Sequence, residues 1–228
     1  MRVLGKVISG SRIHLGFYNI NYGGLKYGGL GLYIQNPRVV LEARKGEGLL
    51  VGFPAELIDQ VTEVVESICS SKRDFSLIVR ESPPIHIGLG VSTQILLSTA
   101  KLASVLCNKK PSFKELVEIT GRGRYSGIGI HAFRVGGFIV DGGTKGSEGY
   151  PPLIYRAVFP SEWKIVLVLP KGLRGLRDDE EPIILDNLVS KVKEEENHVL
   201  ISVAFTKIIR GLSTRDFCLF VDGVEVLQ

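Results

Sequence analysis

The first third of the chain alternates apolar and polar residues in short runs. These runs are rich in β-branched and aromatic residues and are separated by glycines and an Asn-Pro pair. A period of two is typical of strands that bury one face. We therefore expect an antiparallel sheet built from residues 2–9, 11–20, 29–36 and 38–43.

Apolar residues at helical spacing begin at residue 54. The segment 54–71 starts with Pro54 and carries one apolar face, which predicts an amphipathic helix. That face consists of Leu57, Val61, Val64, Val65 and Ile68. Residues 95–106 are apolar almost all round, so we expect that helix to be buried. Ser112 and Glu115 have the spacing of a capping box and predict a further helix start.

The remaining pattern predicts a strand at 75–82, a strand pair at 153–158 and 164–170, and a long helix at 186–212. In that helix Ile201, Phe205, Ile208 and Leu212 follow one face. Strands precede most helices, so the fold class is α+β. Composition shifts at Pro151 and Pro152, which predicts domains at 1–152 and 153–228.

The composition narrows the function classes. The chain has 228 residues, 44% of them hydrophobic, and a net charge of +4 without basic blocks. We therefore expect no nucleic-acid partner and no membrane span. The segment after Met1 resembles a strand rather than a leader, so we expect a cytoplasmic protein. Cys69, Cys107 and Cys218 are widely spaced, and we interpret them as buried free thiols.

The segment "PPIHIGLGVSTQ", residues 83–94, is the strongest chemical signal. Its two glycines allow a ligand to approach the backbone, and the following helix start directs N–H groups at an anion. The predicted phosphate-binding residues are Gly88, Leu89, Gly90, Val91, Ser92, Thr93 and Gln94. Ser92 could hold a phosphate-bound Mg²⁺, or Ser92 or Thr93 could cap the helix.

This segment resembles the phosphate-binding motif of the GHMP superfamily of small-molecule kinases. Further segments resemble one family within it, the archaeal β-ribofuranosylaminobenzene 5′-phosphate synthases of methanopterin biosynthesis. They read "SRIHLGFYNI", "YGGLGLYI", "GRGRYSGIGIHAFRVGGFIVDGG" and "GLRGLRDDEE". The resemblance implies a ribosomal-protein-like N-terminal domain of the GHMP type. Members of that family usually continue further, so it also implies a shortened second domain.

The resemblance implies that phosphoribosyl pyrophosphate loses pyrophosphate, its ribosyl carbon bonds to 4-aminobenzoate, and carbon dioxide leaves. Kinases of this fold place an aspartate shortly after a Ser-Gly pair as a general base. Ser126 and Gly127 are followed here by Ile128 and Gly129. A missing base favours a reaction whose main task is to stabilise departing pyrophosphate, with Mg²⁺ as cofactor.

The guanidinium group of arginine can donate two parallel hydrogen bonds to a phosphate group. We therefore expect Arg122 and Arg124 to bind the leaving pyrophosphate in this bidentate way, although both could instead lie in a solvated loop. Ser11, Arg12 and His14 lie along one strand, where His14 could contact an aromatic acid or act as a structural donor. The other predicted substrate contacts are Ser126, Gly127 and Asp141, the last as a Mg²⁺ or ribose contact or a turn residue. Gly28 and Gly29 are expected to form a turn, or else to line the ligand.

Two other functions remain open from the sequence. One is an ATP-dependent small-molecule kinase, and the other is a catalytically weak binding subunit. The sequence also leaves open the identity of the aromatic acceptor and whether the chain forms a homodimer.

Overall fold

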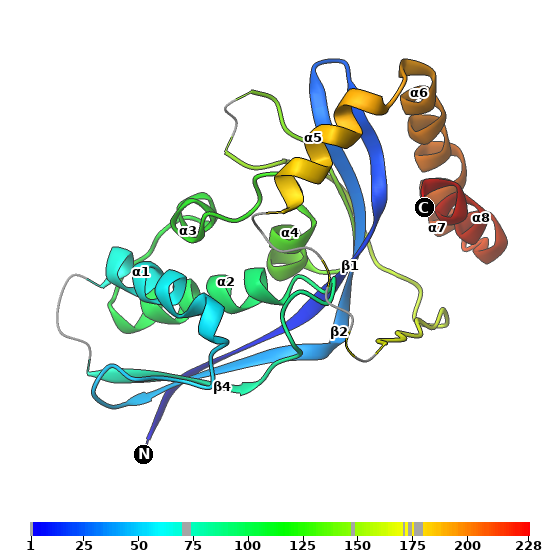
Figure 1. Cartoon of the computed structure of the whole chain (residues 1–228). Helices are drawn as coiled ribbons and strands as arrows, with labels where there is room; N and C mark the ends of the chain where they lie inside the picture. The colour runs from blue at the N-terminus through cyan, green and yellow to red at the C-terminus, as the bar shows by residue number, and fades with distance from the viewer. Residues whose placement is uncertain (1, 70–73, 147–148, 171, 173–174, 176–179) are drawn as a thin grey trace. The chain divides into compact units, whose positions relative to one another are not determined.

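The computed structural model describes residues 2–69, 74–146, 149–170, 172, 175 and 180–228. The chain forms two compact units (Figure 1). Unit 1 contains the chain up to Ser11 and Ile34–Arg122, and unit 2 contains Arg12–Tyr33 and Gly123–Gln228. The predicted domain bounds of 1–152 and 153–228 remain a prediction.

Two long strands supply residues to both units: β1 (Val3–Tyr22) and β2 (Leu25–Lys45). They replace the four short strands that the sequence predicted. Glycines and the Asn36-Pro37 pair indicated breaks, but β2 continues through both types of position. Strand pairing with neighbours far along the chain therefore decides where these strands end, and local turn signals do not.

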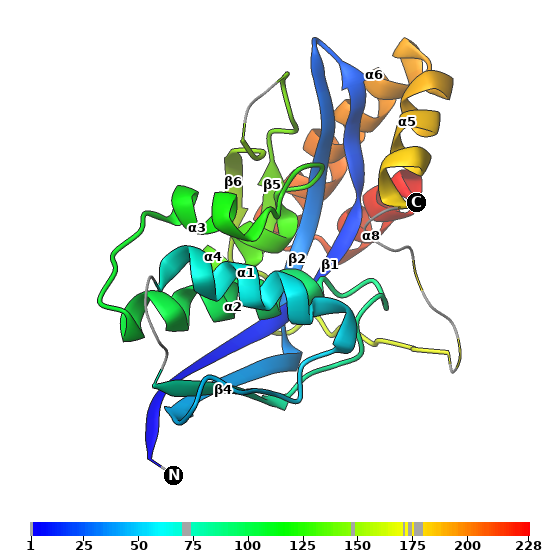
Figure 2. The same cartoon turned by 60° about the vertical axis from the view of Figure 1, so that its left-hand side comes forward.

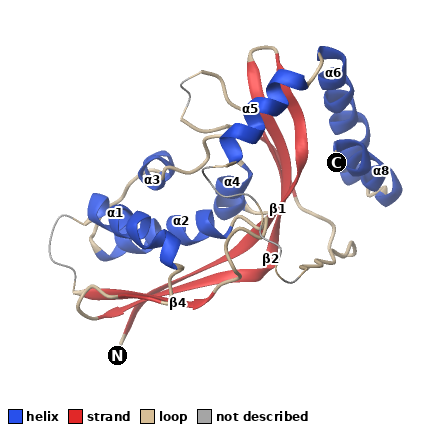
Figure 3. Ribbon diagram, in the orientation of Figure 1, coloured by secondary structure: helices blue, strands red, loops and turns tan. Residues whose placement is uncertain are grey.

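The sheet of unit 1 is completed by β3 (Leu50–Val51) and β4 (Phe75–Glu81). In β2 the residues from Val40 to Lys45 pair with β4 in antiparallel register, and β3 pairs with β4 in parallel. The predicted strand at 75–82 is therefore confirmed. Figure 3 shows the strands of this unit with helices over one face.

The helices of unit 1 are η1 (Ala55–Leu57), α1 (Ile58–Ile68), α2 (Val91–Leu106) and α3 (Phe113–Thr120). The predicted amphipathic face is confirmed, since α1 buries Val61, Val64, Val65 and Ile68. The predicted burial of α2 is also confirmed, because Ile95, Leu96 and Leu97 are fully buried. α3 begins with the expected capping box of Ser112 and Glu115.

A disulfide joins Cys69 to Cys107, with 5.6 Å between the Cα atoms. The prediction of buried free thiols was wrong for these two residues. Cys69 follows the last residue of α1 and Cys107 follows the last residue of α2, so the packing of these two helices brings the thiols together. Cys218 is free but exposed, which corrects its predicted burial.

Unit 2 contains β5 (Phe138–Asp141), β6 (Leu153–Ala157) and α4 (Ile128–Val135). β5 pairs with β2 on one edge and with β6 on the other, and both pairings are antiparallel. Neighbouring residues of β5 face opposite sides: Ile139 packs in a cluster with Ile128 of α4, whereas Phe138 meets Phe220 at 6.1 Å. β5 therefore anchors helices on both faces of this sheet.

The segment 181–228 is mainly helical. Its helices are α5 (Glu181–Lys191), α6 (Glu194–Val203), η2 (Ala204–Ile209), α7 (Arg210–Thr214) and α8 (Phe217–Leu227), and Figure 2 gives a second view of them.

The predicted long helix at 186–212 is interrupted between α5 and α6, so that prediction was wrong in extent. The π-helical geometry of η2 also changes the phase of its side chains. Ile208 is consequently buried while Phe205 is 61% exposed. The predicted strand at 153–158 is confirmed as β6, but residues 164–170 form no strand.

Within the part of the chain that the structure describes, no helix combines the length and the apolar character needed to cross a membrane.

The disulfide gives a first prediction. It closes a loop with a sequence separation of 38, so Cys107→Ser should lower the free energy of unfolding by about 3–4 kcal/mol. Chemical denaturation of the oxidised proteins measures this loss. Cys218→Ser is the matched control, and its stability should stay within about 0.5 kcal/mol of the starting protein. Equal stability of both variants would show that the disulfide contributes nothing.

Candidate functional site

The glycine loop of unit 1 leads directly into α2. Gly88 and Gly90 have φ angles of 79° and 68°, in the left-handed region that favours glycine. Gly90 is the N-cap residue of α2, and no side-chain hydrogen bond caps this helix start. The interpretation of Ser92 or Thr93 as a helix cap is therefore wrong, because the helix has already begun at Val91.

The loop has the geometry of an anion site. The N–H of Gln94 donates the first bond within α2, to the carbonyl of Gly90 at 3.2 Å, so the N–H groups of Val91, Ser92 and Thr93 have no acceptor inside the helix. Apart from Gly88 and its two chain neighbours, no described residue has an atom within 4 Å of the position that a Cβ on Gly88 would take. The space over Gly88 can therefore admit a phosphate group, which the dipole of α2 favours.

Other residues of the predicted loop are held in the interior of unit 1. Leu89 and Val91 are 4% and 2% exposed, so their side chains fix the loop to the core. Gln94 is fully buried and accepts a hydrogen bond from the hydroxyl of Ser9. The buried hydroxyl of Ser11 donates to the carbonyl of Pro37 at 2.7 Å. The side chains of Ser11 and Gln94 are thus engaged within the protein.

The two predicted clamp arginines belong to different units. Arg122 ends the chain segment of unit 1, where its guanidinium donates to Gln60 of α1 at 2.5 Å. Arg124 lies in unit 2 and is exposed. The clamp therefore remains a prediction.

Asp141 is the most connected site residue of unit 2. Its Oδ1 accepts the N–H of Gly29 and of Gly143, both at 3.0 Å, and its Oδ2 accepts the N–H of Gly127 at 2.7 Å. The side chain is fully buried at the end of β5. Asp141 therefore joins β2, the start of α4 and the turn after β5, which brings together the predicted residues Gly29, Gly127 and Asp141.

Burial raises the pKa of Asp141 to about 6, although the three backbone N–H groups and the Ser126 hydroxyl oppose this rise by stabilising the carboxylate. Ser126 therefore also contacts Asp141, together with Gly29 and Gly127. The Tyr18 hydroxyl donates to the Asp141 carbonyl at 3.0 Å, and burial together with the Asp141 charge raises the pKa of Tyr18 to about 12. Tyr18 therefore stays protonated as a donor.

Gly28 has no room for a Cβ, and Gly29 has little. A Cβ on Gly28 would lie 2.7 Å from Cζ of Tyr18. A Cβ on Gly29 would lie 3.1 Å from Nε2 of His14 and 3.3 Å from Oδ2 of Asp141. The imidazole and the carboxylate therefore face the same side of Gly29.

His14 is a neutral donor. The N–H of Gly16 donates to Nδ1 of His14 at 3.2 Å, so the neutral ring carries its proton on Nε2. Nε2 is buried and has no hydrogen-bond partner among the described residues. Burial, with a smaller contribution from the charge of Arg12, lowers the pKa of His14 to about 3. Burial lowers the pKa of Arg12 itself, and the negative charge of Glu181 opposes this change by raising it.

An aromatic group beside His14 was missed by the sequence reasoning. Phe17 lies 4.7 Å from the His14 ring, Tyr27 lies 6.0 Å from Phe17, and Tyr125 lies 5.8 Å from Tyr27. Tyr27 also donates to Asp186 of α5 at 3.3 Å. These residues come from β1, β2 and the segment before α4. Only the number of aromatic residues in "HLGFYNI" could have indicated that they gather.

A second buried histidine has a structural role. Nε2 of His131 donates to the carbonyl of Pro151 at 2.9 Å, and the residue is 1% exposed. Burial lowers the pKa of His131, so it too is neutral. It packs against Gly127, where a Cβ would lie 2.9 Å from its ring.

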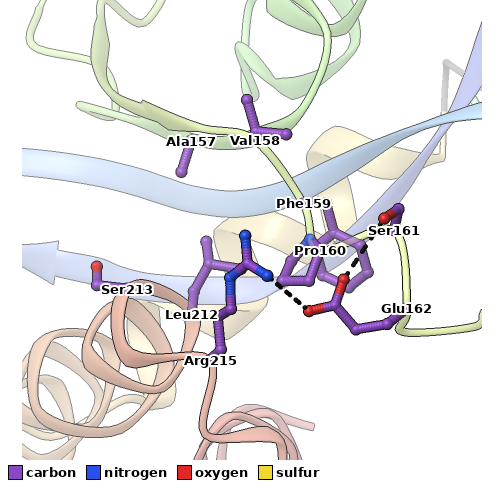
Figure 4. A pocket seen from close by; sticks show the side chains of 9 residues that line it. All are labelled: Ala157, Val158, Phe159, Pro160, Ser161, Glu162, Leu212, Ser213 and Arg215. Carbon is purple, nitrogen blue, oxygen red and sulfur yellow. Dashed lines mark hydrogen bonds and ion pairs between the residues drawn. The ribbon is translucent and has the colours of Figure 1, made fainter.

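Unit 2 contains a pocket of about 330 Å³. The side chain of Arg215 and its ion pair with Glu162 lie at the edge of this pocket (Figure 4). Its lining contains none of the predicted site residues. The lining residues are Ala157, Val158, Phe159, Pro160, Ser161, Glu162, Leu212, Ser213 and Arg215.

The chain is similar in sequence to archaeal proteins named beta-ribofuranosylphenol 5'-phosphate synthase. It is 32% identical to that of Methanocaldococcus jannaschii over 195 residues, which covers 71% of this chain and 58% of the relative. It is 29% identical to that of Methanothermobacter thermautotrophicus over 246 residues, which covers 96% of this chain and 73% of the relative. The chain thus spans 58–73% of the length of these two relatives. No sequence profile of a known protein family matches it.

The fold is that of the GHMP kinases, which confirms the predicted fold class. Phosphomevalonate kinase of Streptococcus pneumoniae has a TM-score of 0.67 at 11% identity, covering 99% of this chain and 78% of the kinase. Mevalonate kinase of Methanococcus jannaschii has a TM-score of 0.62 at 16% identity, covering 98% and 78% of the two chains.

Asp141 gives the second prediction. The two carboxylate oxygens of Asp141 together accept three N–H groups. Asp141→Asn replaces one of these oxygens with an NH₂ group, so at least one buried N–H donor loses its acceptor. The free energy of unfolding should fall by about 1–3 kcal/mol in chemical denaturation. Asp222→Asn is the matched control, because it removes only a surface ion pair with Lys207 and should cost less than about 1 kcal/mol. Equal losses in the two variants would contradict the role of Asp141.

His14 gives the third prediction, on pH dependence. The pKa of His14 is about 3 in the folded protein and 6.5 in the unfolded chain, so the unfolded chain binds the proton first as the pH falls. The stability that neutral His14 contributes is fully present above pH 6.5, and it decreases as the pH falls toward 3. Between pH 7 and pH 5 the folded protein should lose on the order of 1–2 kcal/mol that His14→Gln does not lose. Denaturation at the two pH values measures the difference, and parallel losses would refute it.

Proposed function

We propose that this protein is a ribosyltransferase that condenses phosphoribosyl pyrophosphate with a 4-substituted benzoate. The bond from the ribosyl carbon to pyrophosphate breaks, a bond to the carboxyl-bearing ring carbon forms, and carbon dioxide leaves with return of the electron pair to the ring. The relatives are named for a ribofuranosylphenol product. 4-Hydroxybenzoate therefore stands beside the expected 4-aminobenzoate as the acceptor, in methanopterin-type biosynthesis.

The observation that carries this proposal is the anion site at the start of α2. Three helical N–H groups and open space over Gly88 suit the pyrophosphate of the donor. Such donors stabilise the charge that develops on the leaving group, which is the main demand of this reaction.

Magnesium fits the loop through phosphate oxygens. Ser92 is the second residue of α2 and would supply a hydroxyl ligand, while the ion would neutralise pyrophosphate charge. Within the described residues no three His, Cys, Asp or Glu side chains gather as a metal site. The start of α2 would thus hold the ion through the Ser92 hydroxyl and through the bound phosphate groups.

The kinase alternative needs a base near Ser126 and Gly127. The carboxylate beside them is Asp141, which is buried and accepts three backbone N–H groups. A carboxylate engaged in this way is poorly placed to take a proton from an alcohol. This observation favours the transferase over the kinase.

The fourth prediction tests the reaction. With phosphoribosyl pyrophosphate and Mg²⁺, the protein should release labelled carbon dioxide from carboxyl-labelled 4-hydroxybenzoate or 4-aminobenzoate. Arg124→Lys keeps the charge but loses the bidentate fork, so the release rate should fall at least tenfold while the melting temperature is unchanged. Arg134→Lys, at an exposed arginine of α4, is the control and should retain the starting rate.

Two results would count against this function. No release of carbon dioxide from either acid would refute the transferase, and phosphate transfer from ATP to an alcohol would establish the kinase. Full release by Arg124→Lys would remove Arg124 from the site without affecting the reaction.

A further inference from the structure

The glycine loop of unit 1 is held differently on its two sides. After Gly88, the side chains of Leu89 and Val91 are 4% and 2% exposed, so packing in the core fixes their positions. Before Gly88, none of the residues 82–87 is buried. The position of Gly88 on this side therefore depends on contacts other than core packing.

His86 supplies such a contact. Its Nε2 lies 3.1 Å from Oε2 of Glu56 in η1, and Nε2–H is the donor because a carboxylate oxygen only accepts. The side chain of His86 is 9% exposed, whereas that of Glu56 is 43% exposed. A hydrogen bond to a carboxylate is stronger than one between neutral groups, and the low exposure of the ring reduces competition from water. This contact thus ties the loop, two residues before Gly88, to η1.

The backbone of His86 adopts a conformation that a histidine rarely takes without support. Its φ angle is 60°, in the left-handed region, and Gly88 and Gly90 follow in the same region at 79° and 68°. A residue other than glycine persists there where its surroundings hold it. If the ring of His86 were released, its backbone could return to an ordinary conformation, and Gly88 would move with it.

The helix face that holds His86 also holds Arg122. Gln60 of α1 follows Glu56 by four residues, so the two side chains are neighbours on one face. Gln60 accepts a hydrogen bond from the guanidinium of Arg122 at 2.5 Å, and Arg122 is one of the two arginines predicted to bind pyrophosphate. These residues and the glycine loop all belong to unit 1, so the arrangement does not depend on where unit 2 lies.

We propose that His86 is a positioning residue of the anion site, whose hydrogen bond to Glu56 holds the glycine loop in the conformation that binds pyrophosphate. This inference rests on the proposed function, because the same loop would hold the leaving pyrophosphate. A loop that is ordered before binding spares the ligand the free energy of ordering it. Loss of the hydrogen bond should therefore weaken pyrophosphate binding while the protein still folds.

The experiment is a double-mutant cycle. Calorimetry measures the dissociation constant of inorganic pyrophosphate, with Mg²⁺, for the starting protein, Glu56→Ala, His86→Ala and the double variant. Each single variant should weaken binding about fivefold, the cost of ordering one more residue on binding. The double variant should bind no more weakly than the single variants, because all three lack the same hydrogen bond.

Conservative variants separate positioning from damage to the fold. Glu56→Gln keeps an acceptor oxygen and His86→Gln keeps an N–H donor, so each should recover most of the affinity. A role in stability alone would change the melting temperature and leave the affinity as it was. Glu194→Ala is the matched control, since it removes the contact at 3.8 Å with His198 on α6 and should keep the starting affinity. If His86→Ala does not fold, Glu56→Ala at the exposed carboxylate still removes the hydrogen bond.

The outcomes distinguish this inference from the proposed function. Unchanged affinity in Glu56→Ala, additive losses in the double variant, or no pyrophosphate binding by the starting protein would overturn the role of His86. Pyrophosphate binding that depends on Glu56, without release of carbon dioxide, would support the role of His86 and refute the transferase. Release of carbon dioxide together with pyrophosphate binding that is independent of Glu56 would support the transferase and overturn the role of His86.

Discussion

The carboxylate of Asp141 is the interaction on which the arrangement of unit 2 depends. Its two oxygens accept N–H groups from Gly29, Gly127 and Gly143, so one buried side chain fixes a strand, a helix start and a turn. Glycine at Gly127 and Gly143 is a steric necessity, because a Cβ would lie 2.9 Å from the ring of His131 or 2.4 Å from the carbonyl oxygen of Lys26. The orientation of His14 toward Gly29 thus belongs to the same packing as the Asp141 hydrogen bonds.

Local signals predicted the helices better than the strands. The apolar face of α1 and the capping box at Ser112 and Glu115 involve residues within one or two helical turns, so the sequence contains everything that they need. The continuity of β2 through Pro37 depends on β4 and β5, which lie far along the chain. The disulfide of Cys69 and Cys107 likewise depends on how α1 and α2 pack.

The candidate site could be predicted as far as its chemistry is local. The positive φ angles of Gly88 and Gly90 and the helix after them follow from the loop itself. Asp141 was expected to be a contact or a turn residue, yet its three N–H partners include Gly29, which is 112 residues away. The neutral state of His14 comes from burial, which no spacing reveals.

Units 1 and 2 are interleaved along the chain, since β1 and β2 each contribute to both. A cut of the backbone after Arg122 therefore keeps all of unit 1 in the first fragment, but it deprives the later fragment of Arg12–Tyr33, including its Gly29. Unit 2 therefore needs residues from both fragments. We therefore expect unit 2 to form only when the two fragments are combined, and not when the later fragment refolds alone.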